Sequence, residues 1–398
     1  MDTRLHILIA IESFFDGGAE MFAIRLANEL ALTQRVYFIE LYPYLAKEKR
    51  QLQLLDQQRV RLIQPGKNFI GDWLYKHGHN ERTPLTGFKK KIEDIYQLLK
   101  KKRVRQVIKW HKINTVNSHS WDSDVYFAAL KKEITFKLVA SFHGHYDFLA
   151  DMRSGFEQAT IFTLGHTDAV IYTAPEHRKI LDSHLFPEAK RHKIFYGVSM
   201  PVSCTLTRYQ LGTCLNLVMA ARGIPEKGWE EAILAVLCLL KIYPGLLKLN
   251  LVGEGAFLND LKIKYQDPAI IFSGYTDNVM QVVHQAHIGL LPTYFIAESL
   301  PNTIIEYLVC GKPVITTYTG AIPEMITDCG ETGGICIDLE NGKVNKDHIS
   351  SVIENYLINP GLVEKHSEIA LQAAEKFTMS TCIANYLNIF NLQSPDKN

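Results

Sequence analysis

Apolar and polar residues alternate along the chain in two repeating patterns. Short apolar runs, such as 5–11 (LHILIAI), 215–220 (LNLVMA) and 287–293 (HIGLLPT), are bounded by turn-forming or polar residues. Runs of this length predict strands buried on both faces of a parallel sheet. The stretches between them, for example 21–30 and 229–241, carry apolar residues at helical spacing. The pattern therefore predicts an α/β protein in which strands and helices alternate.

The alternation is interrupted once, at 199–210, where Pro, Ser, Thr and Arg occur without apolar periodicity. Two successive α/β halves joined by one linker predict two doubly wound, Rossmann-like parallel-sheet domains that face each other across a cleft. We expect an N-terminal domain at 1–198, a linker at 199–210 and a C-terminal domain at 211–376. Residues 377–398 contain the last predicted helix.

The stretch 294–320 (YFIAESLPNTIIEYLVCGKPVITTYTG) places two carboxylates, Glu298 and Glu306, around a loop that becomes a helix between two strands. Pro301 suits a first helical turn, so the helix is expected at 301–310. Its first N–H groups lie beyond the carboxyl end of a strand. Open parallel sheets bind ligands at this position, and the dipole of a helix that begins there favours an anion.

Glu306 shares one face of the predicted helix with Asn302 and Thr303, which precede it by four and three residues. Glutamates in such a pattern are more often solvated, but Glu306 lies between Ile305 and Tyr307 in an apolar run. A carboxylate in these surroundings requires a partner, and the hydroxyl groups of a ligand would provide one. The segment thus predicts an anion site followed by a site for vicinal hydroxyl groups.

Two cations lie in the loop 221–228, between a predicted strand and a predicted helix. Arg222 and Lys227 are accompanied there by Gly223 and Gly228. Arg can form two parallel hydrogen bonds to a phosphate and Lys acts as a point charge, so the loop suits a diphosphate. Surface cations are usually only solvated, but the position at the carboxyl edge of a strand favours binding.

Two further turns follow predicted strands. Gly17 and Gly18 occupy a strand-to-helix turn, where tight chain reversal is the ordinary meaning and close approach of a ligand is the alternative. Gly274 and Tyr275 end the strand at 270–273, where backbone or ring would meet a nucleobase.

His143 directly follows the predicted strand at 137–142 and precedes a glycine. A side chain at this position either projects toward a ligand or caps the strand end, and the residues alone leave both open. His119 is a weaker candidate. Asp122 and Asp124 could be taken for a metal-binding D-x-D triplet, but they open a predicted helix, where carboxylates serve as N-caps. We expect no metal site.

The segment 88–112 is predicted to be a helix in which ten basic residues oppose only Glu93 and Asp94. Its apolar residues recur at helical spacing and define one face: Phe88, Ile92, Ile95, Tyr96 and Leu99. Either this face packs on the sheet while the charged face is solvated, or residues 89–112 contact an anionic membrane.

Composition excludes several classes of protein. A net charge of +1 gives no overall attraction to nucleic acid, so no nucleic-acid partner is expected. Seven cysteines without a C-x-x-C pair favour a reducing cytoplasm. No signal-peptide pattern precedes the first strand, and the longest apolar stretch, 232–240, is shorter than the ~20 residues of a membrane span. We expect a cytoplasmic protein, at the inner face of the cell membrane if the basic helix binds lipid.

Glu298, Glu306, the following Gly-Lys-Pro-Val-Ile strand and the residues 319–324 (TGAIPE) together resemble the E-x7-E region of the retaining GT-B glycosyltransferases of family 4. The resemblance covers nearly the whole chain and implies that residues 377–398 cross back to the N-terminal domain. Pro301 stands where many members have glycine, which removes one amide donor. The resemblance implies the catalytic residues His143, Arg222, Lys227 and Glu298. It also implies a donor-binding set: Gly17, Gly18, Gly274, Tyr275, Leu300, Asn302, Thr303 and Glu306.

The function that this resemblance implies is metal-independent transfer, with retention, of a hexosyl or N-acetylhexosaminyl group. The donor would be a nucleotide-diphosphate sugar and the acceptor a glycan or lipid-linked glycan, in polysaccharide or glycoconjugate biosynthesis, without a cofactor. In that family the leaving phosphate helps to deprotonate the acceptor. Two alternatives stay open: a sugar-nucleotide epimerase of the same fold, and a sugar-nucleotide-binding protein without turnover.

Overall fold

The structure is a computed structural model that describes residues 4–15, 17–46, 49–65, 67, 69–74, 87–143, 155–198 and 205–392, with the backbone alone at 69, 72, 74 and 89. The chain divides into two compact units. Unit 1 comprises Met1–Thr173, His177–Gly197 and Met379–Asn398, and unit 2 comprises Ala174–Glu176 and Val198–Thr378. Most of the loop at 65–86 and residues 199–204 of the predicted linker lie outside the described residues.

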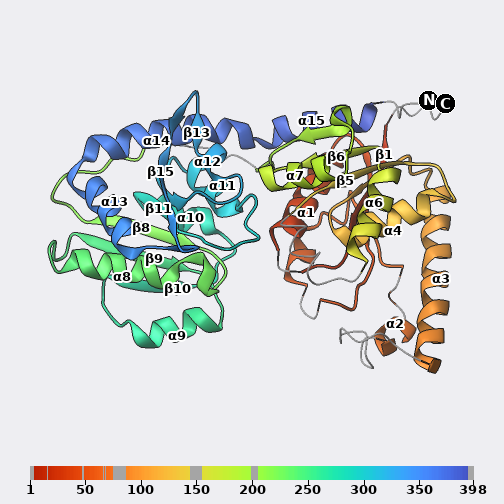
Figure 1. The fold of residues 1–398 in the computed structure, drawn as a ribbon, viewed down its shortest axis with the longest axis horizontal. Coiled ribbons are helices and arrows are strands. Elements are labelled where there is room, and N and C mark those ends of the chain that lie inside the picture. The colour runs from red at the N-terminus through yellow and green to blue at the C-terminus, as the bar shows by residue number, and fades with distance from the viewer. Residues whose placement is uncertain are drawn as a thin grey trace. The chain divides into compact units, whose positions relative to one another are not determined.

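Unit 1 contains a seven-stranded parallel sheet in the order β3-β2-β1-β4-β5-β6-β7 (Figure 1). The strands are β1 (His6–Ile11), β2 (Arg35–Glu40), β3 (Arg61–Ile63), β4 (Thr115–Ser118), β5 (Lys137–Ser141), β6 (Ala169–Tyr172) and β7 (Arg191–Lys193). The helices are α1 (Gly18–Leu30), α2 (Phe69–Leu74), α3 (Gly87–Trp110), α4 (Trp121–Lys131), α6 (Phe156–His166), α7 (Pro175–Ser183) and α15 (Met379–Asn391), with 3₁₀ turns η1 (Arg50–Leu54) and η3 (Glu188–Lys190). The C-terminal helix α15 belongs to this unit.

Unit 2 contains a six-stranded parallel sheet in the order β10-β9-β8-β11-β12-β15. The strands are β8 (Leu215–Ala220), β9 (Leu247–Val252), β10 (Ile270–Gly274), β11 (Ile288–Leu291), β12 (Val314–Thr317) and β15 (Gly334–Ile337). The helices are α8 (Trp229–Leu240), α9 (Ala256–Lys264), α10 (Val279–His284), α11 (Asn302–Val309), α12 (Ile322–Met325), α13 (Lys346–Ile358) and α14 (Pro360–Ala374), with η4 (Pro225–Lys227) and η5 (Glu375–Phe377). Two short hairpins complete it: β13 (Thr327–Asp328) with β14 (Glu331–Thr332), and β16 (Leu339–Glu340) with β17 (Lys343–Val344).

The central strands are buried, as their continuous apolar sequences predict. In β1 the residues Ile7, Leu8 and Ile9 are fully buried, and Leu217 and Leu249 of β8 and β9 are equally inaccessible. Helices packed on the sheets exclude water from these strands, so both faces accept apolar side chains. The predicted α/β class, with two parallel-sheet domains, is confirmed.

Both sheets reverse their winding at one point. The strand order leaves β1 and β4 adjacent in unit 1, and β8 and β11 adjacent in unit 2, although each pair is separated by two intervening strands in sequence. In doubly wound sheets the loops beyond the carboxyl ends of such a pair diverge and leave room for a ligand. The loops after β8 and β11 are therefore where a ligand of unit 2 is expected.

Part of the predicted linker is packed rather than free. Thr207 is buried, its N–H donates to Ser367 Oγ at 2.7 Å, and its hydroxyl donates to Gly311 O at 2.8 Å. The packing of this segment is not visible in the sequence, because its polar side chains form hydrogen bonds instead of an apolar face. Residues 205–210 thus belong to unit 2.

Candidate functional site

Lys227 and Glu298 form a buried ion pair at the switch point of unit 2. The Lys227 ammonium contacts Glu298 Oε2, and the two side chains are only 7% and 10% exposed. Thr293 Oγ1 donates to the same carboxylate oxygen at 3.2 Å. Removing two charges from water is costly, and mutual attraction offsets the cost only when the geometry is good. The pair links the loop after β8 to the loop after β11.

Backbone contacts hold these two loops together. Tyr294 N–H donates to Glu226 O at 2.8 Å, which joins the loop after β11 to η4. Gly228 directly precedes α8 and has a φ of +81°, and a Cβ there would clash with Pro292 O. Gly320 has a φ of +56°, and a Cβ there would likewise clash with Glu298 O. Only glycine tolerates both the positive φ and the close approach, so these residues place the ion pair.

Arg222 supplies a second cation to the same region. Its side chain is exposed, and its guanidinium carbon lies 5.4 Å from the ring centroid of Phe295. Lys227 Nζ lies 5.0 Å from that centroid, so one ring is near both cations. The Arg222 carbonyl accepts a hydrogen bond from Trp229 Nε1 at 2.9 Å, which ties the loop to α8. Phe295 and Thr293 were missed from sequence because neither is charged.

The N-terminus of α11 opens without a side-chain cap. Pro301 has an extended conformation and is the residue before the helix, so the expected helix start is one residue early. Its neighbour Leu300 is buried, whereas Asn302 and Thr303 are half-buried. The N–H groups of a first helical turn have no acceptor within the helix. Asn302 Oδ1 is buried and has no hydrogen-bond partner among the described residues. Both features suit a polar ligand.

Glu306 is half-buried on α11, between side chains that are fully buried. Tyr307 fixes the helix: its hydroxyl donates to Leu290 O at 3.1 Å and accepts from Ala220 N–H at 2.9 Å. A Cβ on Gly289 would clash with its ring, so the helix lies close to β11. The hydroxyl group of a buried tyrosine needs hydrogen-bond partners. A tyrosine within the apolar run of this helix was therefore a sign, already visible in the sequence, that the helix packs closely on the sheet.

Gly274 and Tyr275 are not brought to the ion pair. They end β10, the edge strand, and β9 lies between β10 and β8. Gly274 has a φ of +75°, and the exposed Tyr275 donates its hydroxyl hydrogen to Asp277 Oδ1 at 2.8 Å. These two residues thus lie at the same end of the sheet as the ion pair, on a strand that is two positions away from β8.

In unit 1 the turn that contains Gly17 and Gly18 lies beside the carboxylate of Glu20. Gly17 precedes α1 in extended conformation, and Gln51 Nε2 donates to its carbonyl at 3.3 Å. A Cβ on Gly17 would clash with the Glu20 carboxylate, which therefore folds back over the start of α1. A phosphate bound at this turn would have to displace Glu20.

His143 is held at both ring nitrogens. Asn117 Nδ2 donates to Val139 O at 3.0 Å, so Asn117 Oδ1 accepts from His119 Nε2 at 2.7 Å. Neutral His119 then accepts at Nδ1 from His143 Nε2 at 2.9 Å, and His143 Nδ1 accepts from the Tyr196 hydroxyl. Burial lowers the pKa of His119 to about 3. Burial, followed by the field of His119, also holds the pKa of His143 well below its ordinary value, so both rings are neutral.

The D-x-D triplet has a structural role. Ser120, not either aspartate, caps α4, and its side chain accepts from Ser123 N–H. Asp122 and Asp124 lie in the first turn, and the Ser118 hydroxyl donates to Asp124. In the described part of the chain, no group of three or more His, Cys, Asp or Glu residues is placed to hold a metal ion. Asp122 and Asp124, which were expected to be N-caps, are thus residues of the first helical turn.

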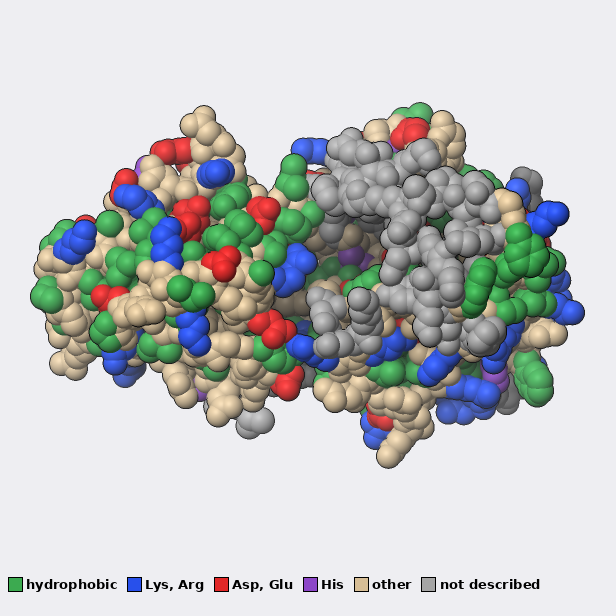
Figure 2. Space-filling view, turned by 90° about the horizontal axis from the view of Figure 1, so that it is seen from below, with side chains coloured by type: hydrophobic (Ala, Val, Ile, Leu, Met, Phe, Trp, Pro, Cys, Tyr) green, Lys and Arg blue, Asp and Glu red, His purple; other side chains and the backbone are tan. Residues whose placement is uncertain are grey.

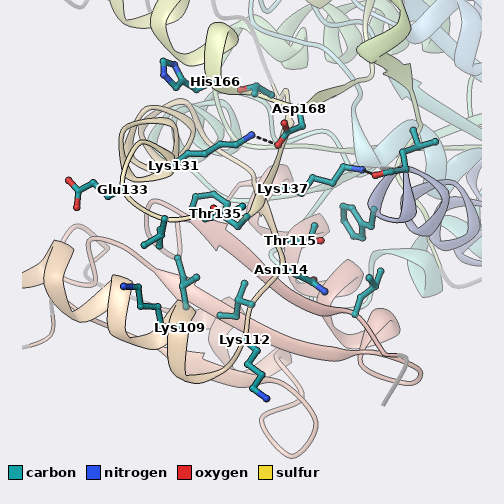
Figure 3. A pocket seen from close by; sticks show the side chains of 18 of the residues that line it. Lys109, Lys112, Asn114, Thr115, Lys131, Glu133, Thr135, Lys137, His166 and Asp168 are labelled. Carbon is teal, nitrogen blue, oxygen red and sulfur yellow. Dashed lines mark hydrogen bonds and ion pairs between the residues drawn. The ribbon is translucent and has the colours of Figure 1, made fainter. Parts of the chain in front are cut away.

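A cavity of about 920 Å³ lies at the end of the unit 1 sheet where β4, β5 and β6 begin, opposite the carboxyl ends of the strands (Figure 3). Lys131 forms an ion pair with Asp168, and Lys137 Nζ donates to Leu392 O at 2.6 Å, at the end of α15. The Lys131–Asp168 pair compensates one positive charge of the cavity, whereas the bond of Lys137 to a carbonyl leaves its charge in place. The cavity lies at the amino ends of the strands, so it is distinct from the switch point.

The two parallel sheets, each with a site region at its switch point, define the GT-B class of glycosyltransferase fold. Residues 16–200 match the model of Glycosyltransferase Family 4, and residues 215–355 match that of Glycosyl transferases group 1. The chain belongs to this family of glycosyltransferases.

Individual relatives are distant. N-acetyl-α-D-glucosaminyl L-malate synthase of Bacillus anthracis is 27% identical over 156 residues, which is 38% of this chain. The chain spans about two fifths (39%) of the length of that relative. Anabaena HepE, solved with UDP, is similar with a TM-score of 0.72 and 15% identity over 96% of this chain and 99% of that chain. Sucrose-phosphate synthase of Thermosynechococcus elongatus has a TM-score of 0.69 and 14% identity over 97% and 98% of the two chains.

Proposed function

We propose that the protein is a retaining glycosyltransferase that moves a hexosyl or N-acetylhexosaminyl group from a nucleotide-diphosphate sugar to a glycan or lipid-linked glycan. The observation that carries the proposal is the buried Lys227–Glu298 pair at the unit 2 switch point. A structural role alone does not require two charges to be buried at the edge where doubly wound sheets bind ligands.

Each side chain then has a role that its surroundings support. Lys227 has three N–H donors, so it can remain paired with Glu298 while it donates to a phosphate oxygen. Arg222, exposed beside it, adds a second positive charge to the leaving diphosphate. Asn302 and Thr303 offer the N–H groups of the first turn of α11. Glu298 would accept from sugar hydroxyl groups and Glu306 from ribose hydroxyl groups.

The proposed transfer requires no general base from the protein. The bond between the sugar C1 and the diphosphate oxygen breaks, and a bond between C1 and an acceptor oxygen forms on the same face of the sugar. The acceptor proton passes to the leaving phosphate oxygen. Neutralisation of that phosphate by Arg222 and Lys227 is the main electrostatic contribution that we assign to the protein.

The proposed role of His143 is contact with the donor sugar. Because both of its ring nitrogens are bonded within unit 1, such a contact would use the backbone carbonyl or would displace Tyr196. We assign the reaction to the cytoplasm, which the free state of the six described cysteines supports.

The test is a transfer assay with the full chain. A panel of nucleotide-diphosphate sugars, beginning with UDP-glucose and UDP-N-acetylglucosamine, is incubated with and without oligosaccharide and lipid-linked acceptors. Nucleoside diphosphate release is measured, and the anomeric configuration of the product is read by proton NMR. Acceptor-dependent release with retained configuration supports the proposal. An epimerised donor, binding without turnover, or an inverted product would each overturn it.

A further inference from the structure

The helix α3 turns a row of large apolar side chains outward. Phe88, Ile95, Leu98, Leu99 and Trp110 are 76%, 56%, 67%, 51% and 83% exposed. At 3.6 residues per turn they fall within about one third of the helix circumference. Exposed apolar side chains on a soluble surface are normally scattered singly. A row of five on one helix indicates a partner.

Four cations lie in or beside the same sector. Lys91, Lys102, Arg103 and Lys109 are exposed, and none of them forms an ion pair with any residue that the structure describes. The acids of α3, Glu93 and Asp94, instead pair with Lys90. We call this set of five apolar and four basic residues the outer face of α3. Figure 2 shows apolar and basic side chains next to one another at the right-hand end of the view, over α3.

The remaining sides of α3 are fixed to unit 1. Lys100 is only 1% exposed, and its Nζ lies 3.7 Å from the centroid of the Tyr42 ring. Lys101 and Arg105 both pair with Glu133. The helix therefore cannot rotate to bury its outer face. Of the two alternatives that the sequence left open, packing of Phe88, Ile95 and Leu99 on the sheet is wrong, because all three side chains are exposed.

The chemistry of the outer face selects the partner. A second copy of the chain in a two-fold dimer would bring the same cations against one another, which is unfavourable. A partner must offer apolar volume and negative charge together along the length of the helix, about 36 Å for 24 residues. The surface of an anionic lipid bilayer offers both, and interfacial helices combine basic and bulky apolar residues in this way. We propose that the outer face of α3 docks on an anionic membrane.

The C-terminal end of α3 extends the positive region. Lys109 belongs to the outer face and, with Lys112, also lines the cavity of unit 1 (Figure 3). Neither lysine forms an ion pair with a described residue. The positive charge thus continues past the last turn of the helix, where lipid phosphates would meet it.

The test is co-sedimentation of the full chain with vesicles. Phosphatidylglycerol-containing and pure phosphatidylcholine vesicles are compared at low and high salt. The wild type should bind only the anionic vesicles, and binding should weaken with salt because the attraction is screened. Lys102→Glu/Lys109→Glu should weaken binding by at least about tenfold. Leu98→Ser/Leu99→Ser should also weaken it, because apolar insertion is lost.

A matched control separates the outer face from net charge. Lys241→Glu/Lys262→Glu makes the same charge change at exposed lysines of α9 and the end of α8. It should bind as the wild type does, and circular dichroism should show all variants folded. Equal loss in this control would overturn the proposal. So would a wild type that stays in the supernatant at low salt, or light scattering that shows a dimer lost on Leu98→Ser/Leu99→Ser.

Discussion

The ammonium of Lys227 and the carboxylate of Glu298 are in contact although 71 residues separate them in the sequence. Each follows a different strand of the unit 2 sheet, and the winding of that sheet places β8 beside β11. The pair is nearly excluded from water, so either partner alone would be a buried, uncompensated charge. This relationship places a charged group in the region where the donor phosphates are proposed to bind.

The stability of unit 2 should depend on both partners together. Lys227→Met leaves Glu298 buried without its cation and should lower the free energy of unfolding by about 3 to 5 kcal/mol. Lys227→Met/Glu298→Leu removes both charges and should recover most of that loss. Urea unfolding followed by circular dichroism measures both. A single variant within about 1 kcal/mol of the wild type would mean that water reaches the pair.

Glu306 should bind the ribose of the nucleotide. Glu306→Ala removes an acceptor of hydrogen bonds from vicinal hydroxyl groups and should weaken nucleoside diphosphate binding by about 1.5 to 3 kcal/mol. The matched comparison uses the 2′-deoxy nucleotide. Wild type should lose affinity for it and Glu306→Ala should not, since the interaction is already absent. Affinities are measured by calorimetry. If removal of the 2′-hydroxyl group weakens binding equally in both proteins, Glu306 does not contact the ribose.

Transfer should persist when divalent metal ions are chelated. Arg222 and Lys227 are the cations assigned to the diphosphate, so an excess of EDTA should leave the turnover number within about twofold. Initial rates with and without EDTA are compared at saturating donor. Activity that disappears with EDTA and returns with manganese or magnesium would contradict this assignment.

Lys100 should make stability depend on pH. Burial lowers the pKa of Lys100 from its ordinary value of 10.5 to about 7, while the Tyr42 ring contacts the ammonium. Between these values the unfolded chain holds a proton that the folded chain has released, so this group's contribution to stability rises with pH and is lost as pH falls toward 7. The slope is at most about 1.4 kcal/mol per pH unit.

The check compares urea unfolding of the wild type with that of Lys100→Met at several pH values from neutral to alkaline. The difference between the two proteins isolates Lys100 from other titrating groups. The variant should be relatively more stable at neutral pH, and its advantage should shrink as pH rises. Parallel pH profiles would show that Lys100 keeps its ordinary pKa.

The strands and the motif positions could be predicted because both are local. A buried parallel strand is a continuous apolar run, and each of Arg222, Lys227 and Glu298 follows such a run. The contact between Lys227 and Glu298 could not be predicted, because it depends on which strands become neighbours. Residues such as Thr293 and Phe295 carry no charge and are recognised only once the loops are placed.

Side-chain direction was the other limit. In α3 apolar and basic residues occur on both sides, so helical spacing defines faces without showing which one faces the core. Lys100 is buried among tyrosines that come from distant segments, and Phe88 is exposed. His143 was placed correctly at a strand end, but its partner Tyr196 lies 53 residues further along the chain.

Calorimetric titration of nucleoside diphosphates tests the donor site most directly. The wild type is compared with Lys227→Met/Glu298→Leu, which keeps the fold while removing the buried charges, and with Lys241→Met, which removes an exposed lysine elsewhere in unit 2. The account predicts that one nucleoside diphosphate binds the wild type and Lys241→Met equally. It also predicts that the double variant binds it about 10- to 150-fold more weakly, the loss of one charge-assisted hydrogen bond. Equal affinity in the folded double variant, or a wild type that binds none of the panel, would contradict the account.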